Sequence, residues 1–196
     1  MKCLYCDKEI DTLSLTSLFL KEDELCEKCR KQLNRERKII EVSGLKIETF
    51  YEYDGLFRSM LLQYKECHDE ALKGVFLYGI EDYINLRYFG YQLLPVPSTG
   101  TKIRQRGFDH LAGIFENVKL SRVKGLMMKR EMCQEGKSLS ERREIIDNYS
   151  YKGVHLNKVL IVDDVVTTGS SLMGVFRTIE PISKKIKVLS LAYKKY

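Results

Sequence analysis

The chain has 196 residues, of which 44% are hydrophobic, which is enough for one domain and a small appendage with an ordinary core. Its formal net charge of +6 is a modest excess. No run approaches the roughly 20 apolar residues of a membrane span, and the start, MKC, lacks the apolar region of a signal peptide, so we expect a cytoplasmic protein.

Four cysteines lie within the first 30 residues in the spacing C-x2-C-x19-C-x2-C: Cys3, Cys6, Cys26 and Cys29. In a cytoplasmic chain this clustering favours a metal over disulfides, and two C-x2-C pairs can present four thiolates to one tetrahedral ion. We predict a structural zinc site whose ion supplies the folding free energy of a segment too short for its own core. The alternatives are reduced thiols in an unstructured segment or a redox pair. Cys67 and Cys133 are interpreted as ordinary half-buried residues.

The segment after the second cysteine pair is basic. Between residues 28 and 38 a single acid, Glu36, stands against six basic residues: Lys28, Arg30, Lys31, Arg35, Arg37 and Lys38. Such a segment could contact nucleic acid phosphates or could be a solvated helix face, and both interpretations stay open because no aromatic residue between 27 and 38 could stack on bases. Residues 29–40 are expected to form a helix or an extended linker leading toward Gly44. We divide the chain into residues 1–40, the cysteine module with its basic exit segment, and residues 41–196.

Strand-like and helix-like patterns alternate through the rest of the chain. The expected elements are, in order, a strand at 45–53, helices at 56–64 and 70–86, a buried strand at 91–96, and a helix at 108–118. A short strand at 126–128, a helix opened by a capping box at Ser138 and Glu141, a strand at 159–162, a helix at 170–179 and a strand at 186–192 follow. This alternation predicts a parallel α/β sheet flanked by helices.

The most informative run is VLIVDDVVTTGSSL, residues 159–172, in which an apolar strand is expected to end at two carboxylates before a hydroxyl-rich loop and a helix. Ligands bind at the carboxyl ends of strands in such sheets. Gly169 lets backbone amides turn toward an anion, the hydroxyls add donors, and the helix contributes its positive end. Asp163 and Asp164 suit the hydroxyls of an attached sugar, directly or with Mg2+ nearby. A ribose 5-phosphate therefore fits.

The loop is neither a P-loop nor a dinucleotide-binding fingerprint, since it lacks both glycine patterns. It resembles the phosphoribosyl pyrophosphate (PRPP) motif of type I phosphoribosyltransferases, in which a strand and two acids precede T-T-G-x-[ST]. This resemblance assigns Asp163 and Asp164, also the expected catalytic residues, to the ribose hydroxyls. The loop that would bind the 5-phosphate comprises Thr167, Thr168, Gly169, Ser170 and Ser171.

A wider resemblance covers nearly the whole chain. The two cysteine pairs, LLPVPSTGTKIRQRGFDHL (93–111), QEGKSLSERREIIDN (134–148) and the PRPP loop are together similar to the competence protein F (ComF, ComFC-like) family. The resemblance implies a type I phosphoribosyltransferase-like domain with a zinc finger. It also implies a role in handling incoming single-stranded DNA in the cytoplasm during natural transformation, together with a competence DNA helicase or translocase (ComFA-like). The chain departs from the family at Asp109-His110, where Asn-Gln is common, and its spacing around residues 134–139 is slightly long.

Three basic residues follow the strand that ends in PVP: Lys102, Arg104 and Arg106. They are placed to meet the pyrophosphate of PRPP, or DNA, if this loop folds over the site, and their charge suits both; a solvated loop is the alternative. Arg142 and Arg143 could approach the ligand from a loop or lie on an exposed helix face. His110 is interpreted as structural rather than as an acid or base.

Enzymatic turnover is left open, because no segment indicates a purine or pyrimidine pocket. An active enzyme would displace pyrophosphate from C1 of PRPP with a nitrogen nucleophile, Mg2+ neutralising the leaving group. The leading hypothesis is a DNA-processing competence protein with a PRPP-type loop. The alternatives are an active phosphoribosyltransferase of nucleotide salvage, and an interaction subunit whose loop is a relic.

Overall fold

The computed structural model describes residues 1–10, 23–129 and 148–195. Its centre is a six-stranded sheet in the order β1-β2-β8-β7-β4, with β3 paired to β8. The strands are β1 (Lys38–Val42), β2 (Leu45–Thr49), β3 (Tyr51–Glu52), β4 (Gln92–Pro95), β7 (Leu156–Val166) and β8 (Ser183–Tyr193). A separate two-stranded antiparallel sheet contains β5 (Leu126–Met128) and β6 (Tyr149–Tyr151).

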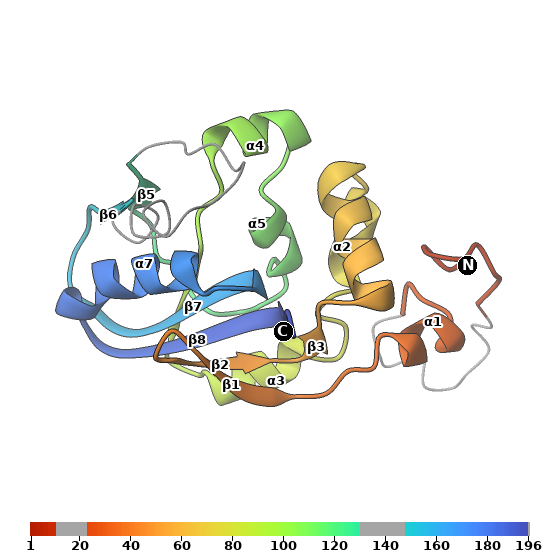
Figure 1. Cartoon of the computed structure of the whole chain (residues 1–196), viewed down its shortest axis with the longest axis horizontal. Helices are drawn as coiled ribbons and strands as arrows, with labels where there is room; N and C mark the ends of the chain where they lie inside the picture. Colours follow the sequence, from red (N-terminus) through yellow and green to blue (C-terminus); the bar gives the residue numbers. More distant parts are fainter. Residues whose placement is uncertain (11–22, 130–147, 196) are drawn as a thin grey trace.

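The helices surround this sheet. They are α1 (Glu27–Gln32), α2 (Gly55–Glu66), α3 (Glu81–Arg87), α4 (Gly100–Arg106), α5 (His110–Ile114) and α7 (Ser170–Ile179), with 3-10 turns η2 (Glu70–Gly74) and η3 (Glu180–Ile182). In Figure 1, α7, α5 and α2 lie along the upper face of the sheet, α4 lies above α5, and the N-terminal module stands beyond α2. Among the described residues, no helix combines the length and the apolar character needed to cross a bilayer.

The predicted α/β architecture is confirmed, but the sheet is mixed rather than wholly parallel. Strands β2, β8, β7 and β4 run parallel, whereas β1 pairs antiparallel with β2. The two-residue turn between β1 and β2 holds Ser43 at φ 53° and Gly44 at φ 80°. Two consecutive positive φ angles are typical of a tight hairpin, so Gly44, expected near a boundary, instead turns the chain within the sheet.

Strand β7 is much longer than the predicted segment 159–162. Its pairing with β8 continues through Asp163 opposite Ser190 and on to Val166 opposite Tyr193. The prediction that the strand ends at the two acids was therefore wrong: both acids lie within the strand, three residues or fewer from its last residue. The adjacent residues Val165 and Val166 continue the pairing, opposite Ala192 and Tyr193, because β8 extends equally far.

Three helix predictions need correction. Residues 70–86 form the 3-10 turn η2 and the separate helix α3, and Gly79 between them has φ +66°. Residues 100–106, predicted as a loop, form α4, whose first turn is capped by the Thr99 hydroxyl accepting from the Lys102 amide. The helix expected over 108–118 is only α5. The capping box at 138–141, Cys133, Arg142 and Arg143 lie outside the described residues.

One hydrophobic core joins the sheet to the N-terminal module. Leu25, Cys29 and Leu33 of the module are buried in the same cluster as the central strand residues. An aromatic group connects α2 to its neighbours: the Phe57 ring stacks on Tyr51 at 4.7 Å between centroids, and the Tyr64 ring lies 5.0 Å from Phe108. The module therefore does not depend only on a core of its own.

Candidate functional site

The predicted phosphate loop lies between the end of β7 and the start of α7. Gly169 has φ 73°, and a Cβ atom at this position would lie 3.0 Å from Val42 Cγ1 of β1. Its neighbour Thr168 is fixed by Ser43, whose hydroxyl donates to the Thr168 carbonyl at 2.9 Å, and the Thr168 and Ser170 hydroxyls are 3.0 Å apart. The ten-residue helix α7 begins directly after this turn without a side-chain cap. Its first amides thus face the loop, as in anion sites at helix ends.

The two adjacent acids have different environments. Oδ2 of Asp164 receives two donors, Lys65 Nζ of α2 at 2.6 Å and His110 Nε2 of α5 at 2.8 Å. Burial alone would raise the pKa of Asp164, but the charge of Lys65 and the hydrogen bond from His110 hold that pKa well below its usual range. Asp164 is therefore a buried carboxylate with fixed partners.

Asp163 has the opposite tendency. Its Oδ1 accepts from the backbone amide of Asp164 at 2.9 Å. Burial, followed by the negative charge of Asp164, raises the pKa of Asp163 to about 8. A hydroxyl donor or a cation beside Asp163 would relieve this cost, and oxygen ligands of this kind suit Mg2+. Within the acid pair, Asp163 is the side chain best suited to meet a ligand.

The loop after β4 reaches the same site. Because β4 runs parallel to β7 and their register ends with Pro95 opposite Val162, the residues that follow both strands emerge at one edge of the sheet. There the Ser98 hydroxyl lies 3.1 Å from His110 Nδ1, and Arg106 Nη1 lies 3.5 Å from the same nitrogen. His110 thus links the β4 loop and α4 to Asp164.

The basic residues of α4 differ in how their side chains are held. Arg106 is largely buried and also pairs with Glu66 Oε1 of α2 at 3.2 Å. Arg104 donates to the Thr101 hydroxyl within the same helix at 3.1 Å. Arg106 therefore belongs to the network around Asp164, while the more exposed Arg104 is held within α4.

Sequence reasoning missed Lys65, Ser98 and the structural position of His110. Lys65 lies in an amphipathic helix with no motif around it, and its role appears only when α2 packs beside β7. The sequence shows His110 as a titratable residue in a helix, but besides Arg106 its ring partners come from positions 98 and 164. No local pattern carries such long-range information.

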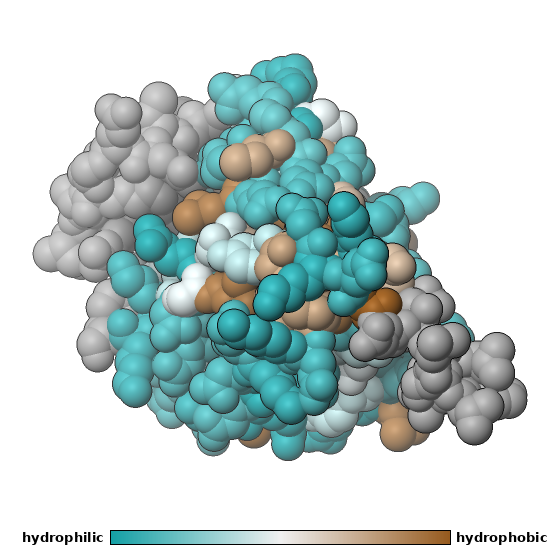
Figure 2. Space-filling view, turned by 90° about the vertical axis from the view of Figure 1, so that its right-hand side faces the viewer, coloured by the Kyte–Doolittle hydropathy of each residue, from teal (hydrophilic) through white to brown (hydrophobic). Residues whose placement is uncertain are grey.

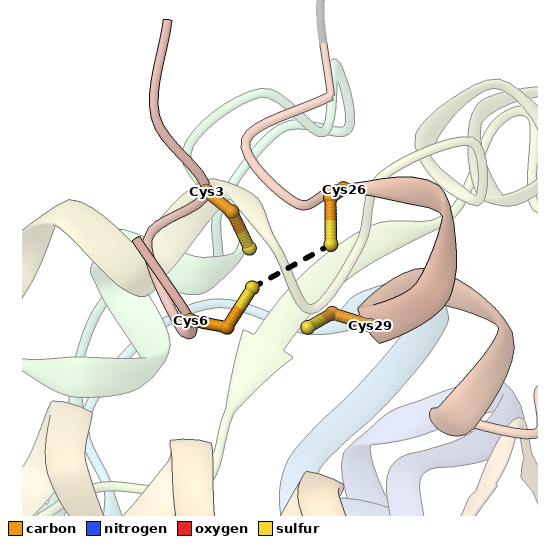
Figure 3. Close-up of side chains that lie close together, drawn as sticks. All are labelled: Cys3, Cys6, Cys26 and Cys29. Atoms are coloured by element: carbon orange, nitrogen blue, oxygen red, sulfur yellow. Dashed lines mark hydrogen bonds between the residues drawn. The ribbon is translucent and has the colours of Figure 1, made fainter. Parts of the chain in front are cut away.

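The four N-terminal cysteines converge as their spacing predicts. Their sulfur atoms all lie within 4.8 Å of one another, and Figure 3 shows the side chains pointing toward a common centre from two segments. Cys6 Sγ and Cys26 Sγ are 3.6 Å apart. Tetrahedral Zn–S bonds of about 2.3 Å place sulfurs at separations of this size. The cluster can hold a metal ion.

The protonation of these thiols supports metal binding. Burial alone would raise the pKa of Cys3, but backbone hydrogen bonds, that from Cys26 first, lower it to about 6. Burial and the neighbouring thiols raise the pKa of Cys29. The Cys3 thiolate therefore forms readily, and the raised pKa of Cys29 is a cost that the positive charge of a bound ion would offset.

The basic exit segment is largely paired within the protein. Arg30 pairs with Asp23 and donates to the Val75 carbonyl at 2.9 Å, and Arg35 donates to the Tyr78 carbonyl at 3.0 Å. Further pairs join Arg37 to Glu48, Lys38 to Glu36 and Lys31 to Glu27. Figure 2, which views the molecule from the side of this module, shows a mostly hydrophilic face with small hydrophobic areas. These contacts favour a structural role for much of the segment's charge.

The fold and its site define an α/β protein with a mixed sheet flanked by helices and an N-terminal four-cysteine module. No family model matches the chain. Over 219 residues, which are 97% of this chain and 99% of the relative, it is 24% identical to Competence protein ComFC of Streptococcus pneumoniae (strain ATCC BAA-255 / R6). This match confirms the resemblance to the competence protein F family.

Comparison with solved structures finds two crystal forms of a hypoxanthine phosphoribosyltransferase from Staphylococcus aureus. The tetragonal form overlaps 63% of this chain and 64% of its own, at 12% identity and a TM-score of 0.41. The orthorhombic form overlaps 65% of this chain and 69% of its own, with the same identity and TM-score.

Proposed function

We propose that this protein acts in natural transformation and binds a ribose-phosphate ligand of the PRPP class. The observation that carries the proposal is the meeting of the acid pair, the hydroxyl loop and the start of α7 at one edge of the sheet. The full-length similarity to a competence protein supports the cellular role. In this role the protein handles incoming single-stranded DNA in the cytoplasm, together with a DNA helicase or translocase.

In the proposed complex the hydroxyl-rich loop binds the phosphate and the acid pair binds the ribose. The 5-phosphate binds the amides and hydroxyls of residues 167–171, where an anion is favoured by the helix end. The ribose hydroxyls donate to Asp163, whose ionised form gains a partner on binding. Asp164, already bonded to Lys65 and His110, fixes the position of its neighbour.

Two metal ions complete the proposal. Zinc binds the four thiolates of the N-terminal cluster and ties its two segments together, a structural role that needs no open coordination position. Mg2+ accompanies PRPP and, when bound, neutralises charge on the pyrophosphate. We keep the division into residues 1–40 and 41–196 as a proposal for two functional units.

The second candidate function is an active phosphoribosyltransferase. In that reaction the bond between C1 of the ribose and pyrophosphate breaks, and a nitrogen nucleophile forms the new bond to C1. Arg106, held beside the site by His110 and Glu66, supplies fixed positive charge for the departing pyrophosphate. The same site geometry favours this candidate over a loop that has lost its function, because Arg106 is still held beside the acid pair by His110 and Glu66.

The deciding experiment is calorimetric titration of PRPP with Mg2+ into the purified protein. We expect saturable binding that is lost in Asp163→Ala. Asp163 is chosen because Asp164 anchors two helices and its removal endangers folding. Circular dichroism should show Asp163→Ala to be folded. Absence of binding to the folded wild type would overturn the ligand assignment, and pyrophosphate release in a screen of nucleobases would select the enzyme.

The nucleic acid role needs a separate measurement. Fluorescence anisotropy with a single-stranded oligonucleotide should show affinity that falls steeply with salt, because phosphate contacts release counterions. Replacing Lys102 and Arg104 by alanine should weaken binding and reduce the salt slope. Lys184→Ala is the matched control, because that lysine is exposed at the start of β8, at the end of the strand away from the candidate site. Equal binding by all variants would place the DNA surface elsewhere.

A further inference from the structure

We propose that His110 is a positioning residue of the candidate site, a neutral imidazole that holds Asp164 on one side and Arg106 on the other. This inference rests on the proposed ribose-phosphate function and names the residue that fixes its two charged halves. It replaces the interpretation of His110 as an ordinary structural histidine.

The chain places His110 with little freedom. Gly107, at φ 83°, ends α4 and lets the chain reverse before α5, and the Asp109 side chain caps α5 by accepting from the Leu111 and Ala112 amides. The His110 carbonyl accepts from the Tyr64 hydroxyl of α2 at 3.0 Å. Residue and side chain are both buried, so the ring is held at its backbone as well as at its nitrogens.

The partners of the ring determine its tautomer. Arginine only donates hydrogen bonds. The ring nitrogen Nδ1, which faces Arg106 Nη1 at 3.5 Å and the Ser98 hydroxyl at 3.1 Å, is therefore the acceptor. The proton then lies on Nε2 and is donated to Asp164 Oδ2 at 2.8 Å.

This tautomer connects the halves of the site. Asp164 precedes the phosphate loop on β7, while Arg106 is the last residue of α4. Only a side chain that donates at one end and accepts at the other can join a carboxylate to an arginine in this order. The imidazole thereby sets the separation between the positive charge that meets the pyrophosphate and the strand that presents the acids to the ribose.

Two substitutions separate positioning from proton transfer. Glutamine has an amide donor and a carbonyl acceptor, so His110→Gln can make both contacts but cannot exchange a proton near neutral pH. Alanine makes neither contact. The control is His155→Ala, because His155 is exposed and lies outside the site.

Calorimetry with PRPP and Mg2+, and with Mg2+ pyrophosphate and ribose 5-phosphate separately, gives the readout. We expect His110→Gln and His155→Ala to bind all three probes within about threefold of wild type, and His110→Ala to bind PRPP roughly tenfold more weakly, the loss of about one charge-assisted contact. Folded His110→Ala with wild-type affinity would overturn the inference. So would an equal loss in the glutamine variant, because glutamine keeps the donor and the acceptor to which the inference assigns the positioning.

A ligand-independent measurement completes the test. Long-range 1H–15N NMR spectra of the wild type should show His110 as the neutral Nε2–H tautomer at neutral pH. A charged ring or the Nδ1–H tautomer would overturn the positioning role. If the tautomer is as expected but the wild type binds none of the probes, the proposed ribose-phosphate function is wrong. The role of His110 in ligand binding is then wrong too, while its contacts with Asp164 and Arg106 stand.

Discussion

The ammonium of Lys65, near the end of α2, lies 2.6 Å from a carboxylate oxygen of Asp164 in β7. The two residues are 99 positions apart in the sequence, and both side chains are mostly buried. This pair joins a helix of the upper layer to the strand that carries the candidate site, so its removal should be felt both in stability and in ligand binding.

Lys65→Met should destabilise the protein by roughly 3 kcal/mol, because the buried carboxylate loses its cation while the methionine fills similar volume. Urea denaturation followed by circular dichroism measures this change. The matched control is Lys31→Met, an exposed lysine paired with Glu27 on α1, which should cost under about 0.5 kcal/mol. Similar effects of the two substitutions would contradict a special role for the Lys65 pair.

The stability of Asp163→Asn relative to the wild type should increase as pH rises. The folded-state pKa of Asp163, about 8, lies above its ordinary value, so the wild type binds an extra proton when folded and loses stability as pH rises toward about 8. Asparagine has no such proton. Thermal unfolding of both proteins between about pH 5 and about pH 8 should therefore show the variant gaining on the wild type. A constant difference across this range would show that Asp163 ionises normally.

Gly169→Ala should weaken ligand binding as well as stability. Its positive φ costs an alanine roughly 1 kcal/mol, and the new Cβ would press on Val42 at 3.0 Å and shift the loop. Gly90→Ala is the control, since Gly90 has φ +77° with nothing within 4 Å of its Cβ position. We expect similar stability losses from the backbone in both variants, but weaker PRPP binding only in Gly169→Ala. Unchanged affinity in that variant would separate the loop from the ligand.

Removal of the metal should lower the unfolding temperature of the whole chain. Cys29 and Leu25 belong to the main hydrophobic core, so the cysteine module and the sheet are expected to unfold together. Calorimetry with and without a strong chelator tests this, and elemental analysis should give about one zinc per chain. Cys26→Ser should reproduce the chelated state, whereas exposed Cys67→Ser should retain the metal. Two separate transitions would contradict the shared core.

The sequence was sufficient for features whose parts are close together along the chain. The cysteine pairs and the loop 167–171 each have a local spacing that reflects their geometry, and α7 begins and ends at the predicted residues. The extension of β7 past Asp164 was missed because it depends on pairing with β8. The helix α4 was missed because its sequence is polar and has no apolar stripe. The hydrogen bond by which Thr99 caps it is seen only in the structure. Lys65, Ser98 and His110 meet by tertiary packing alone.

The hairpin of β1 and β2 has a consequence for how the protein can be divided. Its tip supports Thr168 and Gly169 through Ser43 and Val42, while β1 starts at Lys38, soon after the cysteine module. A truncated protein that starts at residue 41 would lose most of β1 and leave β2 as a bare sheet edge beneath the phosphate loop. If that fragment failed to bind a phosphate ligand, the loss of the β1–β2 hairpin would explain the result. The experiment would then give no information about the metal. A fragment that starts no later than Arg35 would keep the support and make the experiment informative.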